Sequence, residues 1–273
     1  MGDLWRLQRA SNLLIAGAGV IAGGWIALGE LAAPKLLGFA AVSAIGLGAA
    51  GNVANDLQDV AADRVNRPDK RPIAAGRVSR STAHLLAWLG ILFGLGSAAL
   101  VSGWQLVVGL GALPALLSYS RWLKPRGLPG NLGVGVVAGL PLYYGALAVG
   151  RPTAGLVPWT LAAWIHFARE LVKDLEDEAG DRAAGRQTIP VRFGRDAAMR
   201  AAIWTCAAFV PVSVVLPLAV RYRGIYYLVA LLAQSAVVVA ALWVRRRRFA
   251  PASRLLKVAM IIGLLGLVLG RMT

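Results

Sequence analysis

The chain has 273 residues, of which 58% are hydrophobic and only 15% charged, and its mean hydropathy is +0.63. Soluble domains carry roughly 25% charged residues, so this composition indicates a protein with many membrane-spanning helices. The net charge of +16 does not indicate nucleic-acid binding, because long uncharged runs separate the basic residues and aromatic side chains do not accompany them. The single cysteine, Cys206, excludes an intramolecular disulfide.

A helix needs roughly 17–25 mostly apolar residues to cross a bilayer. By this criterion the sequence predicts nine spans, with Gly103 and its neighbours separating the third from the fourth. The spans are predicted at 11–31, 36–58, 82–102, 104–120, 131–149, 153–175, 198–219, 224–244 and 254–271. The predicted fold class is therefore an all-α membrane protein, a single polytopic domain over residues 1–273.

The basic residues predict the orientation of these spans. If the N-terminus is cytoplasmic, most of the 29 Lys and Arg residues fall in cytoplasmic segments, chiefly 64–80, 182–200 and 245–257. This distribution follows the positive-inside rule. We therefore expect a multi-pass cell-membrane protein whose N-terminus lies in the cytoplasm.

Most of the 13 acidic residues lie in two clusters, at the cytoplasmic ends of the second and sixth predicted spans. The first cluster reads Asn55-Asp56-x-x-Asp59-x-x-x-Asp63, and the second runs from Glu170 to Asp181. Spans one to four and five to eight thus each carry a cluster after their second member. This pattern predicts two pseudo-repeated four-helix halves, with spans two and six facing each other across a central cavity.

Helical spacing turns each cluster into a row of ligands, because positions three or four apart share a face. One row is Asn55, Asp59 and Asp63, and the other is Asp174, Asp177 and Asp181. Carboxylate and amide oxygens suit Mg²⁺, whereas a chain with only two histidines is a poor candidate for a zinc site. Mg²⁺ commonly binds together with substrate phosphates, and the basic residues beside both clusters indicate a polyphosphate substrate.

Other interpretations of the clusters exist. They would be helix-end ion pairs if the adjacent arginines only neutralised them. They would mark an ion pathway in a cation or proton transporter, although carboxylates at span ends, crowded by arginines, disfavour cation passage. A non-catalytic protein that binds polyprenyl lipids is a third alternative.

At both clusters the chain resembles the UbiA-type intramembrane prenyltransferases. Residues 55–68 (NDLQDVAADRVNRP) with 70–77 (KRPIAAGR) resemble the first aspartate-rich motif, and residues 169–181 (RELVKDLEDEAGD) resemble the second. A third match is Tyr119-Ser120-x-x-Leu123-Lys124. The family's frequent N-terminal Arg-Pro-x-Asn appears as Arg9-Ala10-Ser11-Asn12, without the proline.

The resemblance implies transfer of a prenyl group from its diphosphate to an acceptor within the membrane, with Mg²⁺ as cofactor. The implied metal ligands are Asn55, Asp59, Asp63, Asp177 and Asp181, with Asp56 and Asp174 as further ligands or as partners of the ligands. The implied catalytic residues are Asp59, Asp63, Asp177 and Asp181. The implied diphosphate-binding residues are Arg9, Arg67, Arg71, Tyr119 and Lys124.

The second block is most similar to the branch of the family that makes archaeal ether lipids. This similarity implies a geranylgeranyl donor and geranylgeranylglyceryl phosphate as acceptor. Because other branches share the first motif, an aromatic acceptor such as 4-hydroxybenzoate or homogentisate is the alternative. The expected partners are thus a polyprenyl diphosphate, the acceptor and membrane lipid.

Overall fold

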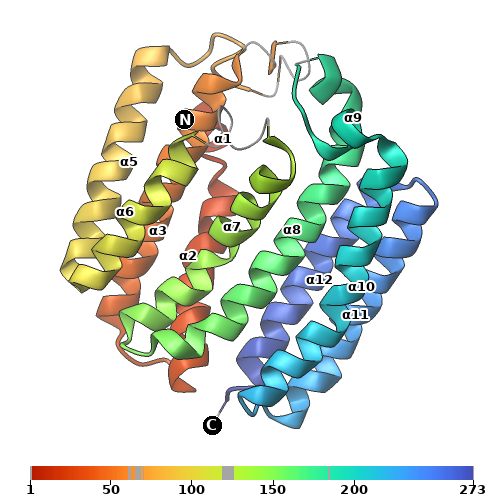
Figure 1. Cartoon of the computed structure of the whole chain (residues 1–273). Helices are drawn as coiled ribbons and strands as arrows, with labels where there is room; N and C mark the ends of the chain where they lie inside the picture. The colour runs from red at the N-terminus through yellow and green to blue at the C-terminus, as the bar shows by residue number, and fades with distance from the viewer. Residues whose placement is uncertain are drawn as a thin grey trace.

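The structure is a computed structural model that describes residues 2–60, 63–64, 69, 71–118, 126–183 and 185–272. Over these residues the chain is a bundle of α-helices without a β-strand (Figure 1). The helices are α1 (Gly2–Gln8), α2 (Ala10–Leu28), α3 (Pro34–Gln58), α5 (Arg80–Val101), α6 (Gly103–Ser118), α7 (Leu128–Ala148), α8 (Pro152–Ala183), α9 (Ile189–Phe193), α10 (Arg195–Ala219), α11 (Gly224–Arg245) and α12 (Phe249–Leu269).

Each predicted span coincides with one long helix, and α5 and α6 are separate helices with Ser102 between them. Within the described residues, six helices are long and apolar enough to cross a bilayer: α3, α5, α7, α10, α11 and α12. The apolar parts of α2 and α6 are shorter, and α8 carries many charges. Membrane crossing by all nine helices, and the internal repeat, therefore stay predictions.

Local sequence signals explain where several helices begin and end. Pro34 and Pro152 stand in the first turns of α3 and α8, where a missing N–H costs no hydrogen bond. Ser79 caps α5, since its Oγ accepts a hydrogen bond of 3.0 Å from the Thr82 amide. Gly29 ends α2 with a φ of 82°, a conformation that glycine adopts without strain.

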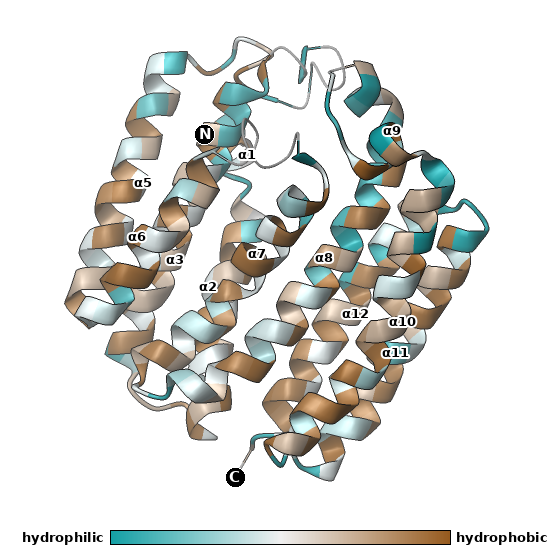
Figure 2. Ribbon diagram, in the orientation of Figure 1, coloured by the Kyte–Doolittle hydropathy of each residue, from teal (hydrophilic) through white to brown (hydrophobic). Residues whose placement is uncertain are grey.

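The helices form a central row of α2, α7 and α8 between two outer groups (Figure 1). Helices α3, α5 and α6 pack together on one side, and α10, α11 and α12 on the other. Hydrophobic residues dominate most of the bundle, whereas hydrophilic residues gather at the end that holds α1 and α9 (Figure 2). Exposed Trp88, Trp104 and Trp204 are typical of outer faces that contact lipid.

Small residues allow the central helices to approach closely. A Cβ atom on Gly145 of α7 would overlap the carbonyl oxygen of Val20 in α2. A Cβ atom on Gly23 of α2 would overlap the carbonyl oxygen of Leu142 in α7. Such reciprocal contacts fix how α2 and α7 cross, as is common in membrane bundles. The central row is thereby held tightly around the site described next.

Candidate active site

A cavity of about 990 Å³ lies within the bundle and receives side chains from both acidic clusters. Its walls come from α2, α3, α6, α7, α8, α10, α11 and α12, so both sides of the bundle contribute. The predicted ligands that line it are Asn55, Asp59, Asp63, Asp174, Asp177 and Asp181. Both predicted rows therefore reach one cavity, although they lie far apart in the sequence.

The first row extends beyond the end of α3. Asp59 is the C-cap of α3, and its amide donates to the Asn55 carbonyl oxygen at 2.9 Å. The Asp63 amide donates in turn to the Asp59 carbonyl oxygen at 2.8 Å. These bonds keep the four-residue helical spacing past Gln58, so the three side chains follow one face.

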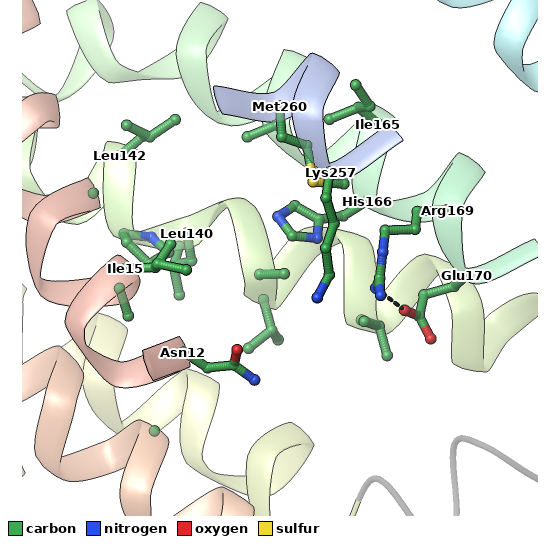
Figure 3. A pocket seen from close by; sticks show the side chains of 18 of the residues that line it. Asn12, Ile15, Leu140, Leu142, Ile165, His166, Arg169, Glu170, Lys257 and Met260 are labelled. Carbon is green, nitrogen blue, oxygen red and sulfur yellow. Dashed lines mark hydrogen bonds and ion pairs between the residues drawn. The ribbon is translucent and has the colours of Figure 1, made fainter. Parts of the chain in front are cut away.

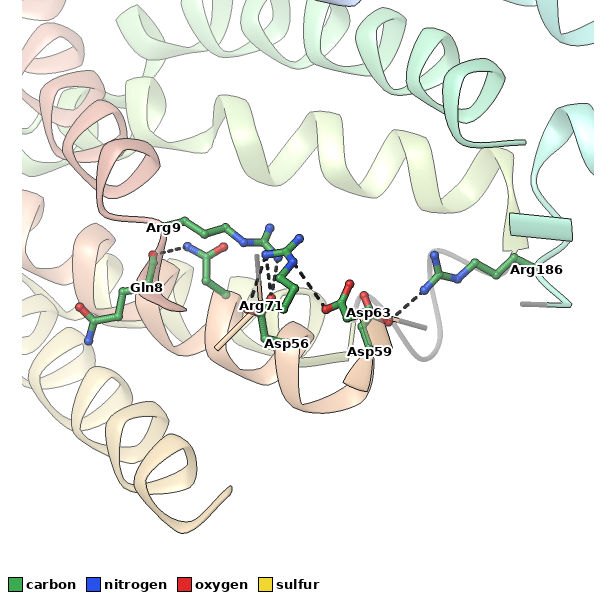
Figure 4. A network of polar contacts seen from close by, with 8 residues as sticks. Gln8, Arg9, Asp56, Asp59, Asp63, Arg71 and Arg186 are labelled. Carbon is green, nitrogen blue, oxygen red and sulfur yellow. Dashed lines mark hydrogen bonds and ion pairs between the residues drawn. The ribbon is translucent and has the colours of Figure 1, made fainter. Parts of the chain in front are cut away.

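Asp56, next to this row, lies behind the cavity wall and is only 2% exposed. Its Oδ1 accepts hydrogen bonds from Arg9 Nη2 at 2.8 Å and from Arg71 Nη1 at 3.2 Å (Figure 4). Arg9 has a left-handed backbone (φ 53°) at the break between α1 and α2. The structure thus places Asp56 as an anchor for two cavity-lining arginines, and its direct binding of metal stays a prediction.

The second row lies inside α8, which continues to Ala183, well beyond the predicted span end at 175. Asp174 and Asp181 are 7% and 3% exposed. Asp174 accepts a hydrogen bond of 2.7 Å from Asn131 Nδ2 in α7. Asp177 pairs with Lys173 Nζ at 3.2 Å, one turn earlier. Each carboxylate thus has a polar partner, as buried charges require.

Arg186 connects the two rows, with a guanidinium only 13% exposed. Its Nη2 lies 3.0 Å from Asp59 Oδ1, and its Nη1 lies 3.2 Å from Asp181 Oδ1. Figure 4 shows this side chain reaching toward Asp59 from the segment after α8. Arg186 is absent from the predicted site residues. The signal available in the sequence was its place directly after the second acidic cluster.

Burial and the neighbouring charges of the first cluster shift the pKa of one of its carboxyl groups, Asp63. Burial raises the pKa of the Asp63 carboxyl, an effect that the Arg71 guanidinium partly offsets and that neighbouring Asp56 and Asp59 reinforce. Arg71 Nε lies 3.5 Å from Asp63 Oδ2. Closely spaced carboxylates are therefore stabilised by cations beside them, which here are arginine side chains.

The oxygen donors around the cavity suit a hard divalent cation such as Mg²⁺. Among the described residues, however, no three His, Cys, Asp or Glu side chains converge closely enough to hold an ion. Asn55 Oδ1 and Asp181 Oδ2 are buried and accept no hydrogen bond from the part of the chain that the structure describes. These two oxygens fit a metal, which the arginine-paired carboxylates would approach on binding.

The predicted diphosphate-binding residues divide into two groups. Arg9 and Arg71 line the cavity beside the first row. Arg67, Tyr119 and Lys124 lie outside the described residues, so their roles remain predictions.

A further polar group lines the cavity, separate from the aspartate rows. His166, Arg169 and Glu170 of α8 lie near Lys257 of α12 (Figure 3). Arg169 Nη1 is 3.2 Å from Glu170 Oε1, and its Nε is buried without a hydrogen-bond partner among the described residues. The signal for this group was charge within predicted spans, since ionisable residues there usually have functional roles.

The sequence and the fold were compared with those of known proteins. Residues 16–264 match the model of the UbiA prenyltransferase family. Digeranylgeranylglyceryl phosphate synthase of Halobacterium salinarum is 40% identical over 98% of this chain and 97% of its own length. A solved structure from work on digeranylgeranylglyceryl phosphate synthase in membranes superposes with a TM-score of 0.83 at 23% identity, covering 99% of this chain and 98% of the other.

A UbiA homologue from Archaeoglobus fulgidus, solved with DMAPP and Mg²⁺ bound, superposes with a TM-score of 0.75 at 18% identity, covering 97% of this chain and 99% of the other. At these identities the superpositions establish the fold, while the family match and the Halobacterium relative extend over most of the sequence. The chain therefore belongs to the UbiA prenyltransferase family and is a prenyltransferase.

Proposed function

We propose that this enzyme transfers a geranylgeranyl group from its diphosphate to the free hydroxyl of geranylgeranylglyceryl phosphate, with Mg²⁺ as cofactor. The observation that carries the proposal is the convergence of both aspartate rows on one cavity. The name of the Halobacterium relative and the DMAPP and Mg²⁺ of the Archaeoglobus structure support the donor, the acceptor class and the metal.

The proposed metal ligands are Asn55, Asp59, Asp63, Asp177 and Asp181. Asp174 holds Asn131 at 2.7 Å and keeps α7 against the second row. When bound, Mg²⁺ would neutralise the charge that builds on the departing diphosphate. The buried oxygens of Asn55 and Asp181 that lack hydrogen-bond partners support their assignment as ligands.

The arginines at the cavity give the diphosphate its remaining contacts in this proposal. Arg71 and Arg186 now pair with carboxylates, and a bound diphosphate would offer them stronger, bidentate partners. Arg9 adds a third cation beside Arg71, since both donate to Asp56. By sequence position, Arg67, Tyr119 and Lys124 complete this set.

The rest of the cavity suits a hydrocarbon chain. Its lining includes apolar side chains from several helices together with glycines that leave free volume: Leu47, Gly48, Val108, Gly109, Leu116, Val134, Leu140 and Leu264. Burial of a prenyl chain contributes about 0.8 kcal/mol for each CH₂ group removed from water. The polar end would then hold the reacting carbon beside the diphosphate, where charge stabilisation lowers the barrier.

The test is reconstitution in liposomes with geranylgeranyl diphosphate, geranylgeranylglyceryl phosphate and Mg²⁺, with mass spectrometry of the lipid product. We expect a doubly prenylated glyceryl phosphate and release of diphosphate, both abolished by EDTA. Asp59→Ala and Asp177→Ala should remove activity. Asp196→Ala is the matched control, because Asp196 is 73% exposed and does not line the cavity.

Three results would contradict the proposal. Product formation by both cavity variants would remove the aspartate rows from the chemistry. Product only with 4-hydroxybenzoate or homogentisate would replace the acceptor. Saturable diphosphate binding or ion flux without any prenylated product would favour a binding protein or a transporter.

A further inference from the structure

Three cations come together on the cavity wall formed by α8 and α12. Arg169 and Lys173 stand one turn apart on α8, and Lys257 comes from α12. Both Arg169 and Lys173 are electrostatic neighbours of Lys257. Figure 3 shows the Lys257 side chain lying between those of His166 and Arg169. Like charges in an apolar bundle repel unless an anion lies between them.

Two ion pairs hold Arg169 and Lys173 and leave out Lys257. Glu170 pairs with Arg169 at 3.2 Å, and Asp177 pairs with Lys173 at 3.2 Å. Neither of these pairs includes Lys257, and Asp177 is also a proposed metal ligand. If Asp177 turns to the metal, Lys173 loses its partner and the local positive charge grows. This part of the cavity wall therefore suits an anionic ligand.

The position of this group separates it from the diphosphate contacts. Arg169 precedes Asp177 by eight residues on α8, which corresponds to about 12 Å along the helix axis at 1.5 Å per residue. Arg71 and Arg186 instead bond to the first aspartate row and to Asp181. One cavity thus offers two cationic regions, one at the aspartate rows and one around Arg169 and Lys257.

Charge balance within the bundle does not explain why Lys257 lies at the cavity. A lysine in a membrane helix normally directs its ammonium to the bilayer surface. Lys257 instead lines the cavity together with His166 and Arg169. The Arg169 Nε is buried and has no hydrogen-bond partner among the described residues. An unused, buried donor beside an ammonium group is suited to the oxygens of a phosphate.

We infer that Arg169 and Lys257, with Lys173 beside them, bind the phosphate monoester of the acceptor lipid. This inference rests on the proposed function, because it assigns the acceptor to the same cavity. It explains how a prenyltransferase selects a phosphorylated glycerol lipid: the two helices recognise the headgroup charge, while the aspartate rows hold the donor. The hydroxyl of the acceptor is thereby directed toward the donor carbon.

The test compares Lys257→Gln with Arg254→Gln. Arg254 is a matched control, since it stands three residues earlier on α12, is exposed and does not line the cavity. Equilibrium binding of geranylgeranylglyceryl phosphate is measured without donor, and KM values for donor and acceptor are measured with it. For Lys257→Gln we expect about tenfold weaker acceptor binding and a similar rise in acceptor KM, as for loss of one charge-assisted contact. The donor KM should change less than about twofold.

A phosphate-free acceptor, geranylgeranylglycerol, isolates the headgroup contribution. Wild type should prefer the phosphorylated acceptor, and Lys257→Gln should reduce that preference about tenfold, whereas Lys257→Arg and Arg254→Gln should keep it. Arg169→Lys retains charge and should lower the preference less than Lys257→Gln. Unchanged acceptor binding in Lys257→Gln, or an equal rise in the donor KM, would overturn the inference.

The outcomes separate this inference from the proposed function. Wild-type transfer to both acceptors without preference would overturn the phosphate subsite and leave prenyl transfer intact. Absence of transfer in wild type would contradict the proposed function. In that case, donor-free binding of the phosphorylated lipid that depends on Lys257 would still support the subsite, and binding that is indifferent to Lys257 would overturn it.

Discussion

Arg186 and Asp59 form an ion pair of 3.0 Å although 127 residues separate them in the sequence. The same guanidinium reaches Asp181 at 3.2 Å, so one side chain neutralises a carboxylate from each aspartate row. In the proposed enzyme, Arg186 thus holds the two rows together until metal and diphosphate bind. The metal would then neutralise the carboxylates, and the diphosphate would pair with the Arg186 guanidinium.

Replacing Arg186 should therefore make stability depend on metal. Arg186→Ala leaves two largely buried carboxylates without this donor, which should lower stability by roughly 2–3 kcal/mol in EDTA. Saturating Mg²⁺ should restore more stability to this variant than to wild type, because the ion replaces the lost charge. The measurement is thermal unfolding in detergent with EDTA and with Mg²⁺.

Arg182→Ala is the control for this experiment. Arg182 stands at the end of α8, four residues before Arg186, and is 63% exposed in its pair with Glu178, so its loss should change stability by less than about 1 kcal/mol. Equal stability of Arg186→Ala and Arg182→Ala in EDTA would show that the contacts of Arg186 with Asp59 and Asp181 do not hold the two rows together.

The contact between α2 and α7 gives a second prediction. Gly145→Ala would place a methyl group against the Val20 carbonyl, which cannot move without shifting α2. We expect a loss of about 1–3 kcal/mol, the usual cost of overpacking. Gly96→Ala in α5 is the control, since a Cβ atom there meets open space. Equal melting temperatures of the two variants would show that the helices separate easily.

Comparison of sequence and structure shows which features are local. The row formed by Asn55, Asp59 and Asp63 could be predicted from the sequence, because residues four apart share one face of a helix. By contrast, the partners of these carboxylates depend on packing between distant helices. Arg186 reaches Asp59 only because the chain after α8 brings its side chain to the cavity, and no periodicity in the sequence predicts this.

Two other site features illustrate the same limit. Arg9 reaches Asp56 because the backbone turns with a positive φ between α1 and α2, a conformation that arginine adopts rarely. Lys257 contributes to the cavity because α12 packs on α8. Its sequence neighbourhood alone is equally typical of a topology signal on the cytoplasmic side.

Glu178 provides a prediction about pH. It lies beyond the predicted span 153–175 and accepts from Arg195 at 2.7 Å and from Arg182 at 3.2 Å. Its partial burial raises the pKa, but the hydrogen bonds and charges of Arg195 and Arg182 outweigh this, so the pKa lies below the ordinary 4.5. A lowered pKa means that the pairs stabilise the fold above pH 4.5 and that this stability is lost as the pH falls through the lowered value.

Glu178→Gln should therefore melt earlier than wild type at pH 7, by an amount corresponding to about 0.5–1 kcal/mol because both arginines are partly exposed and screened. The difference should remain constant down to about pH 5.5 and close as the pH falls below 4.5. High salt should reduce it at pH 7. A difference that persists unchanged at low pH would assign the effect to packing rather than to charge.

The orientation of the enzyme in the membrane can be measured by placing cysteines at the two ends of α10. The positive-inside rule places the start of α10 in the cytoplasm and its end outside. Asp196 and Arg223 are exposed near these two ends, and the native Cys206 is only 1% exposed. Asp196→Cys and Arg223→Cys therefore add reactive thiols to a background whose own thiol is protected.

A membrane-impermeant maleimide should label Arg223→Cys in intact cells and Asp196→Cys only in inverted vesicles. Because the aspartate rows lie at the same end of the bundle as the start of α10, this result would place the active site at the cytoplasmic face. The opposite labelling pattern would reverse the orientation. A donor made in the cytoplasm would then have to cross the membrane before reaction, since a diphosphate does not cross hydrocarbon unaided.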